Sequence, residues 1–141
     1  MNILHVLTSR RRLGNLGEDA AARFLRRKRY RILERNYVGK NGEIDIIAKK
    51  KNMIVFVEVK TRSTFNGNGY EARPAASVDP AKQRRLIRVA NEYARRIHKK
   101  DGCIMRMDII EVYTETNEKT RIRKIIHIED AFNMNSAYRM Y

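Results

Sequence analysis

Two strand-like segments decide the fold of this chain, and both carry charged side chains among apolar ones. They are Gly42-Glu43-Ile44-Asp45-Ile46-Ile47-Ala48 and Val55-Phe56-Val57-Glu58-Val59-Lys60-Thr61-Arg62. Apolar residues of the second segment alternate onto both faces, which is typical of a strand in the middle of a sheet. Only a short connection separates the two segments, so we expect them to pair as neighbouring strands of a hairpin.

The other elements are predicted outward from this pair. An apolar stripe at helical spacing predicts a helix over residues 14–29. Asp79, as an N-cap, and Pro80, at a first helical position, predict the start of a second helix. Strands are expected over residues 31–38, 43–48, 53–61, 104–113 and 121–129, the last two as an antiparallel hairpin, with a long loop over residues 62–79. This order predicts an α/β domain with a central mixed β-sheet flanked by helices.

The length of 141 residues suits a single domain. We divide the chain into a basic N-terminal arm (residues 1–12), one folded domain (13–132) and a polar C-terminal tail (133–141). Cys103 is the only cysteine, which excludes an intrachain disulfide and is typical of a reducing cytosol. No stretch resembles a signal peptide or a membrane span, so we expect a cytoplasmic protein that has no membrane partner.

The charge of the chain indicates its class of partner. There are 31 Lys and Arg residues against 16 Asp and Glu, which gives a formal net charge of +15 at pH 7. Such a charge attracts polyanions, and for a small basic protein the usual polyanion is DNA or RNA. The alternative is a solvated basic surface with no partner.

The acids and the lysine of the two central strands point to metal chemistry. Glu58 and Lys60 are two residues apart, so their side chains leave the same face of a strand. If Asp45 faces the same way as Glu58, two carboxylates and an ammonium converge in an apolar setting. Two close carboxylates repel, which raises the pKa of one of them strongly. A divalent cation removes that conflict, and carboxylate oxygens with water are the ligands that Mg²⁺ prefers.

Phosphodiester hydrolysis needs these groups. A metal polarises a phosphoryl oxygen and lowers the pKa of a water, and a cation such as Lys60 positions the water or offsets negative charge. Glu18, in the first turn of the first predicted helix, is expected to support the site, and Lys82 to contact phosphate or the site. The alternative is an exposed Glu-x-Lys ion pair worth roughly 0–1 kcal/mol. The apolar neighbours argue against it, because charges are costly there.

Other polar residues are assigned structural roles. His5, His98 and His127 show no metal-ligand spacing, and we interpret them as surface or structural residues. Asp108, within an apolar strand, is expected to form a salt bridge with a nearby arginine.

Blocks along most of the domain, from about Gly14 to Phe132, resemble those of a known family. These blocks are Gly14-Asn15-Leu16-Gly17-Glu18, the two central segments, Lys82 with Arg85-Leu86, Arg106-Met107-Asp108-Ile109-Ile110 and Ala131-Phe132. Their order is similar to that of the YraN-like predicted endonucleases, which resemble archaeal Holliday-junction resolvases within the PD-(D/E)xK nuclease superfamily.

The resemblance implies a restriction-endonuclease-like core. It implies that Asp45 and Glu58 bind Mg²⁺ or Mn²⁺, that Lys60 is the catalytic lysine, and that Glu18 is the acid of the first helix that completes the catalytic residues. We expect Arg62, Lys82 and Arg85 to contact the nucleic acid.

The expected function is metal-dependent endonucleolytic hydrolysis of DNA, with branched or recombining DNA as a candidate substrate. A four-way junction has two-fold symmetry, so a homodimer would present two matching sites. The alternative function is a catalytically inactive module that keeps a nuclease fold and binds DNA or RNA.

Overall fold

The computed structural model describes residues 3–63, 78–97, 103–116 and 118–134, with side chains described from residue 14 onward. The elements follow in the order α1 (Ile3–Arg27), β1 (Arg31–Gly39), β2 (Gly42–Lys50), β3 (Met53–Ser63), α2 (Pro80–Arg96), β4 (Ile104–Thr116) and β5 (Thr120–Phe132). All five predicted strands and the second helix are therefore confirmed. Most of the predicted long loop and of the C-terminal tail lies outside the described residues.

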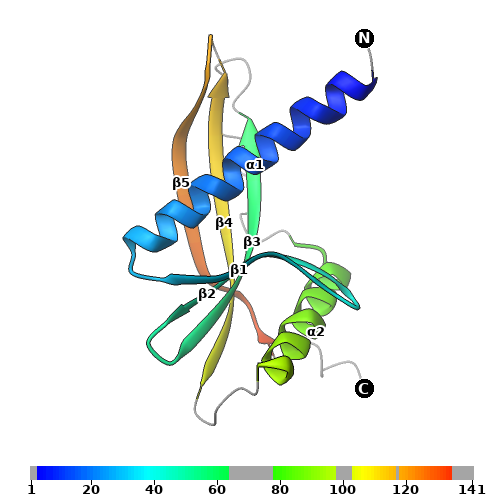
Figure 1. The fold of residues 1–141 in the computed structure, drawn as a ribbon, viewed down its shortest axis with the longest axis vertical. Helices are drawn as coiled ribbons and strands as arrows, with labels where there is room; N and C mark the ends of the chain where they lie inside the picture. Colours follow the sequence, from blue (N-terminus) through cyan, green and yellow to red (C-terminus); the bar gives the residue numbers. More distant parts are fainter. Residues whose placement is uncertain (1–2, 64–77, 98–102, 117, 135–141) are drawn as a thin grey trace.

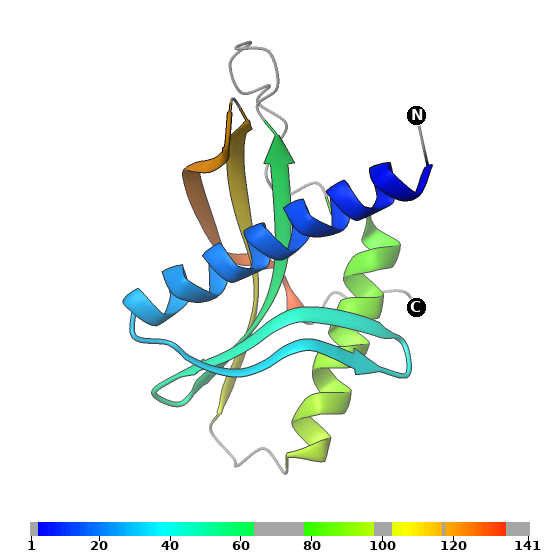
Figure 2. The ribbon, with the colours of Figure 1, turned by 45° about the horizontal axis from the view of Figure 1, so that its top comes forward.

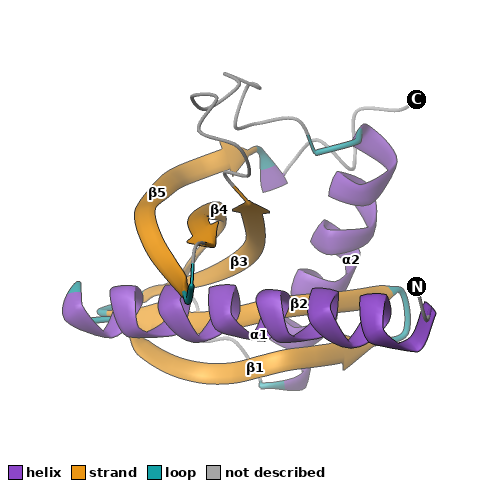
Figure 3. Ribbon diagram, turned by 90° about the horizontal axis from the view of Figure 1, so that it is seen from above, coloured by secondary structure: helices purple, strands orange, loops and turns teal. Residues whose placement is uncertain are grey.

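The five strands form one mixed sheet in the order β1-β2-β3-β4-β5. Strands β3 and β4 pair in parallel, and every other neighbouring pair is antiparallel. The predicted hairpins β2–β3 and β4–β5 are confirmed, and β3 is the central strand. Figure 3, seen from above, shows the strong curl of the sheet, with β5 bending around β4.

The two helices cover opposite faces of the sheet (Figure 1). Side chains of α1 pack on one face with Ile46, Val57 and Ile110, and side chains of α2 pack on the other with Ile47, Phe56 and Ile109. The apolar residues on both faces of β3 are explained by this arrangement, because each face has its own core. Figure 2 shows the β1–β2 hairpin reaching from below α1 to the side of α2.

Helix α1 is longer than the sequence pattern predicts. It begins at Ile3 instead of Gly14, so residues 3–12, expected to be an arm, belong to a 25-residue helix. The physical reason is that this segment holds no proline or glycine and is rich in leucine and arginine, which favour helix. Within the described residues, no helix is both long enough and apolar enough to cross a membrane.

A glycine lets α1 approach the central strand closely. A Cβ atom added at Gly17 would lie 1.9 Å from Oγ1 of Thr61, so no larger side chain fits there without movement. Gly17 precedes Glu18, and Thr61 follows Lys60, so this contact brings the helix acid to the end of β3 that carries the lysine.

Candidate functional site

The candidate site begins where the β2–β3 ladder ends. Pairing runs from Lys50 with Met53 to Ile46 with Val57, and the next residues along the two strands are Asp45 and Glu58. There the backbone N–H of Val59 donates to Oδ2 of Asp45 at 2.8 Å. The Asp45 side chain thus replaces a backbone acceptor. The carboxylates of Asp45 and Glu58 lie close enough to interact electrostatically. The sequence predicted this only if Asp45 faced the same way as Glu58.

Asp45 is held in an unfavourable environment for a carboxylate. Burial, together with the neighbouring Glu58 and Glu18 charges, raises the pKa of Asp45 from a usual value of 3.8 to about 7. The Val59 hydrogen bond and the Lys82 charge oppose this rise without cancelling it. A proton or another cation is therefore favoured at this carboxylate near neutral pH.

Glu58 is buried and already has one cationic partner. The Nζ atom of Lys82 lies 2.5 Å from its Oε1 atom. Lys82 comes from the first turn of α2, which is fixed by Pro80 and by Asp79, whose side chain accepts from the backbone N–H of Ala81 at 3.0 Å. The predicted helix start therefore places Lys82 inside the candidate site.

Lys60 lies among several charges on the same face of β3 as Glu58. Its pKa is lowered by burial and by the neighbouring Arg62 and Lys82, while Glu58 and Glu111 raise it. Its ammonium is thus surrounded by both acids and bases.

Glu18 reaches the edge of this cluster from α1. Its carboxylate raises the pKa of Asp45, and its Oε2 atom lies 4.0 Å from Nη2 of Arg35. The structure therefore brings Glu58 and Glu18 within electrostatic reach of Asp45, and Lys60 within reach of Glu58.

Of the residues expected to contact nucleic acid, Arg62 is bonded to an acid of the sheet and Arg85 is exposed to solvent. Arg62 donates from Nε to Oε2 of Glu111 at 3.1 Å. Arg85 is exposed on α2, one turn beyond Lys82. Glu111 was missed by sequence reasoning, because only the parallel register of β3 with β4 places it beside Lys60. The one available signal was an acid between Ile110 and Val112 in an apolar strand.

The donor set is of the kind that Mg²⁺ or Mn²⁺ takes. Asp45 and Glu58 offer carboxylate oxygens at one place, and a divalent cation there would relieve the repulsion that raises the pKa of Asp45. Across all the described residues, the candidate site included, no group of three or more His, Cys, Asp or Glu side chains is placed to hold a metal, so the site offers two carboxylates. The residues therefore fit a cation that keeps most of its water.

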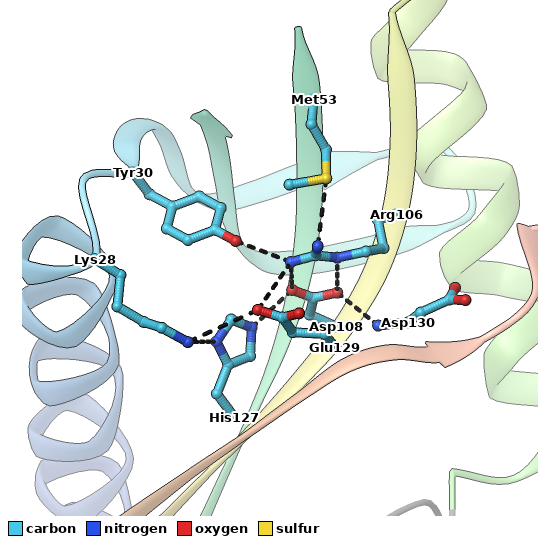
Figure 4. Close-up of polar contacts among 8 residues, drawn as sticks. All are labelled: Lys28, Tyr30, Met53, Arg106, Asp108, His127, Glu129 and Asp130. Atoms are coloured by element: carbon cyan, nitrogen blue, oxygen red, sulfur yellow. Dashed lines mark hydrogen bonds and ion pairs between the residues drawn. The ribbon is translucent and has the colours of Figure 1, made fainter. Parts of the chain in front are cut away.

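A second buried polar cluster lies on the other face of β4 (Figure 4). Asp108 accepts two hydrogen bonds from Arg106 at 2.7 Å, one from the backbone N–H of Asp130, and lies 2.7 Å from Nε2 of His127. Lys28 and Tyr30 bond to His127 and Arg106. The predicted salt bridge of Asp108 and the structural interpretation of His127 are confirmed.

Comparison with known proteins identifies relatives along most of the chain. Residues 17–112 match the model of the uncharacterised protein family UPF0102. A UPF0102 protein of Caldicellulosiruptor saccharolyticus is 45% identical over 124 residues, which cover 88% of this chain and 99% of the relative. Similar proteins occur in Caldanaerobacter subterraneus (43% identical; 88% and 97% covered) and Flavobacterium psychrophilum (45%; 85% and 92%). The chain therefore belongs to the family UPF0102.

Proposed function

We propose that this protein is a metal-dependent endonuclease that hydrolyses phosphodiester bonds in DNA. The observation that carries the proposal is the meeting of Asp45 and Glu58 at the end of the β2–β3 ladder, with Lys60 on the same strand face. Resemblance to the YraN-like predicted endonucleases and to PD-(D/E)xK nucleases supports the same reading, with a restriction-endonuclease-like core.

Each residue of the cluster takes one task in this proposal. Asp45 and Glu58 hold Mg²⁺ or Mn²⁺, which when bound polarises a phosphoryl oxygen and lowers the pKa of a water. Lys60 orients the attacking water and offsets negative charge that develops on the phosphate. Glu18 stabilises the arrangement from α1. Lys82 balances Glu58 before substrate arrives and contacts a phosphate afterwards.

The substrate class follows from charge. A net charge of +15 favours a polyanion, and exposed basic residues such as Arg85 lie on the same helix as Lys82. Branched or recombining DNA is the candidate that the resemblance adds. A homodimer would present two sites to a symmetric junction.

One observation favours a second candidate, a DNA- or RNA-binding module with a nuclease fold and no turnover. Oε1 of Glu58 is already bonded to Lys82, and an internal ammonium can take the role of the cation. In that case the acids would serve only to hold basic residues in place.

A cleavage assay separates the two candidates. The purified protein is incubated with labelled four-way-junction, flap, single-stranded and duplex DNA, with Mg²⁺, with Mn²⁺ or with chelator. Asp45→Ala and Lys60→Ala are compared with Glu115→Gln, which removes an acid of β4 that lies beyond the last residue paired with β3.

The endonuclease proposal predicts metal-dependent cleavage that is lost in Asp45→Ala and Lys60→Ala while binding is kept. Glu115→Gln should cleave like the wild type. Salt-sensitive binding without cleavage of any substrate, and indifferent to Asp45→Ala, would instead establish the binding module.

A further inference from the structure

Glu111 is a buried acid beside the candidate site that the proposed mechanism does not use. It is 1% exposed on β4, and the parallel register makes it the direct neighbour of Lys60 on β3. Its Oε2 atom accepts from Nε of Arg62 at 3.1 Å and from the hydroxyl of Tyr113 at 3.0 Å. Its Oε1 atom is buried without a hydrogen-bond partner among the described residues.

A purely structural role explains this residue poorly. A buried carboxylate oxygen without a partner costs about 1–3 kcal/mol, and an apolar side chain in its place would avoid that cost. The neighbouring Ile110 and Val112 are completely buried apolar residues of the same strand. Asp108, three residues earlier on the opposite face of β4, has hydrogen-bond partners on both oxygens, so the unpaired oxygen of Glu111 is specific to its own face.

Arg62 is the residue that Glu111 holds. Glu58, Lys60 and Arg62 follow one another at every second position of β3, so they form one row on one face. Nε is the only side-chain nitrogen of Arg62 that hydrogen-bonds to a described residue, and the side chain is 29% exposed. Anchoring through Nε orients the two terminal nitrogens of the guanidinium, which donate to none of the described residues.

We propose that Glu111, with Tyr113, is a positioning residue that fixes Arg62 as a phosphate clamp next to the candidate site. An arginine guanidinium matches two phosphate oxygens with two parallel hydrogen bonds, and fixing it in advance lowers the entropy lost on binding. Arg62 then holds a phosphate of the backbone near the one that Lys60 faces. This inference rests on the proposed function for the identity of the ligand as nucleic acid.

The direction in which Glu111→Gln changes DNA affinity separates this positioning role from a general electrostatic effect. Glu111→Gln removes a negative charge from a protein of net charge +15, so long-range attraction alone predicts equal or tighter DNA binding. The positioning role predicts weaker binding, by about three- to tenfold, because Arg62 loses its charged anchor.

Binding is measured by fluorescence anisotropy of a short labelled DNA duplex in chelator, over a series of salt concentrations. Arg62→Ala should lower the slope of log affinity against log salt by about one, as for the loss of one phosphate contact. Glu111→Gln should lower affinity in the wild-type background and have no effect in the Arg62→Ala background. Glu115→Gln, an acid of the same strand paired to Arg123 at 3.3 Å, is the matched control and should not weaken binding.

Thermal unfolding of the same variants excludes a simple loss of structure. If Glu111→Gln leaves binding unchanged or tightens it, or weakens it equally without Arg62, the proposal is overturned. Because binding is measured without metal, a protein that binds through Arg62 and never cleaves would overturn the proposed function alone. Cleavage with binding indifferent to Glu111→Gln would overturn this inference alone.

Discussion

Two aspartates of the central sheet, Asp108 and Asp45, have pKa values shifted in opposite directions. Burial alone would raise the pKa of Asp108, but its hydrogen bonds with His127, Arg106 and the Asp130 N–H bring it below the usual value. Burial and the charges of Glu58 and Glu18 raise the pKa of Asp45 to about 7, because the one backbone N–H that bonds to it does not offset them. The hydrogen bonds of the first aspartate outweigh the effect of its burial, and those of the second do not.

The comparison separates structural from functional polar groups in this chain. The Asp108 cluster joins the connection between α1 and β1 to strands β4 and β5, and its charges satisfy one another. The Asp45 cluster concentrates acids and bases at the end of a ladder without satisfying them all. Imperfect satisfaction of buried charges is typical of sites that bind something.

The largest expected effect is on the satisfied cluster. Asp108→Ala leaves Arg106 and His127 without their shared acceptor, and should lower the free energy of unfolding by about 3–5 kcal/mol. Urea denaturation with chelator present measures this. Glu129→Gln, which removes a more exposed acid 3.8 Å from Arg106, should change stability little. Equal losses of stability in the two variants would contradict the view that Asp108 is the acid that satisfies this cluster.

At Asp45 we expect a substitution to raise the free energy of unfolding instead of lowering it. Its pKa is about 7 in the native protein and 3.8 as its usual value, so the native state binds the proton more tightly. The stability that this group contributes is complete below about pH 3.8 and is lost as the pH rises through 7. Asp45→Asn cannot ionise, so well above pH 7 the metal-free variant should be more stable than the wild type by up to about 4 kcal/mol.

Urea denaturation across pH, again with chelator, measures the difference. The gain of Asp45→Asn should shrink toward zero as the pH approaches 4, where the wild-type carboxyl is protonated too. A variant less stable than the wild type at every pH would mean that the Asp45 carboxylate is satisfied within the fold, like that of Asp108.

A smaller effect is expected from Lys82, the cation already bonded to Glu58. Lys82→Gln removes a competitor for that carboxylate, so Mg²⁺ should bind about tenfold more tightly while DNA binds more weakly. Calorimetric titration with Mg²⁺ measures this. Arg88→Gln, which removes an exposed charge from the same helix, corrects for net charge. Weaker Mg²⁺ binding by Lys82→Gln than by Arg88→Gln would show that Lys82 supports the cation instead of competing with it.

The smallest effect is expected at Arg85, which is exposed one turn beyond Lys82. Arg85→Ala should weaken DNA binding by roughly two- to threefold, with a salt slope lowered by less than about one. Arg95→Ala, at the other end of α2, removes the same charge farther from the site. Identical losses of DNA affinity in both variants would mean that the basic residues of α2 contribute only to the long-range electrostatic attraction of DNA.

Much of the fold was predictable because periodicity and caps are local signals. Strand alternation located β3, and Asp79 with Pro80 located the start of α2. The early start of α1 was not predicted, because Gly14 looked like a boundary and the helix continues through it. The candidate site was predicted as far as Asp45, Glu58 and Lys60, which two neighbouring strands bring together.

The rest of the site depends on contacts between distant segments. Glu111 comes beside Lys60 only through the parallel pairing of β3 with β4, which no local pattern specifies. The ion pair of Lys82 with Glu58 depends on where α2 packs against the sheet. The partners of Asp108 come from β4 and β5, and Tyr30 joins the network through Arg106, so sequence reasoning could name a salt bridge without naming the network.

The most direct test of the central claim is a calorimetric titration of the protein with Mn²⁺, compared with Asp45→Asn and Glu58→Gln. Glu129→Gln, from the satisfied cluster, is the control. The account predicts saturable Mn²⁺ binding by the wild type and by Glu129→Gln, and its loss in both site variants, because the two carboxylates share one cation. Mn²⁺ binding by Asp45→Asn and Glu58→Gln equal to that of the wild type would contradict it.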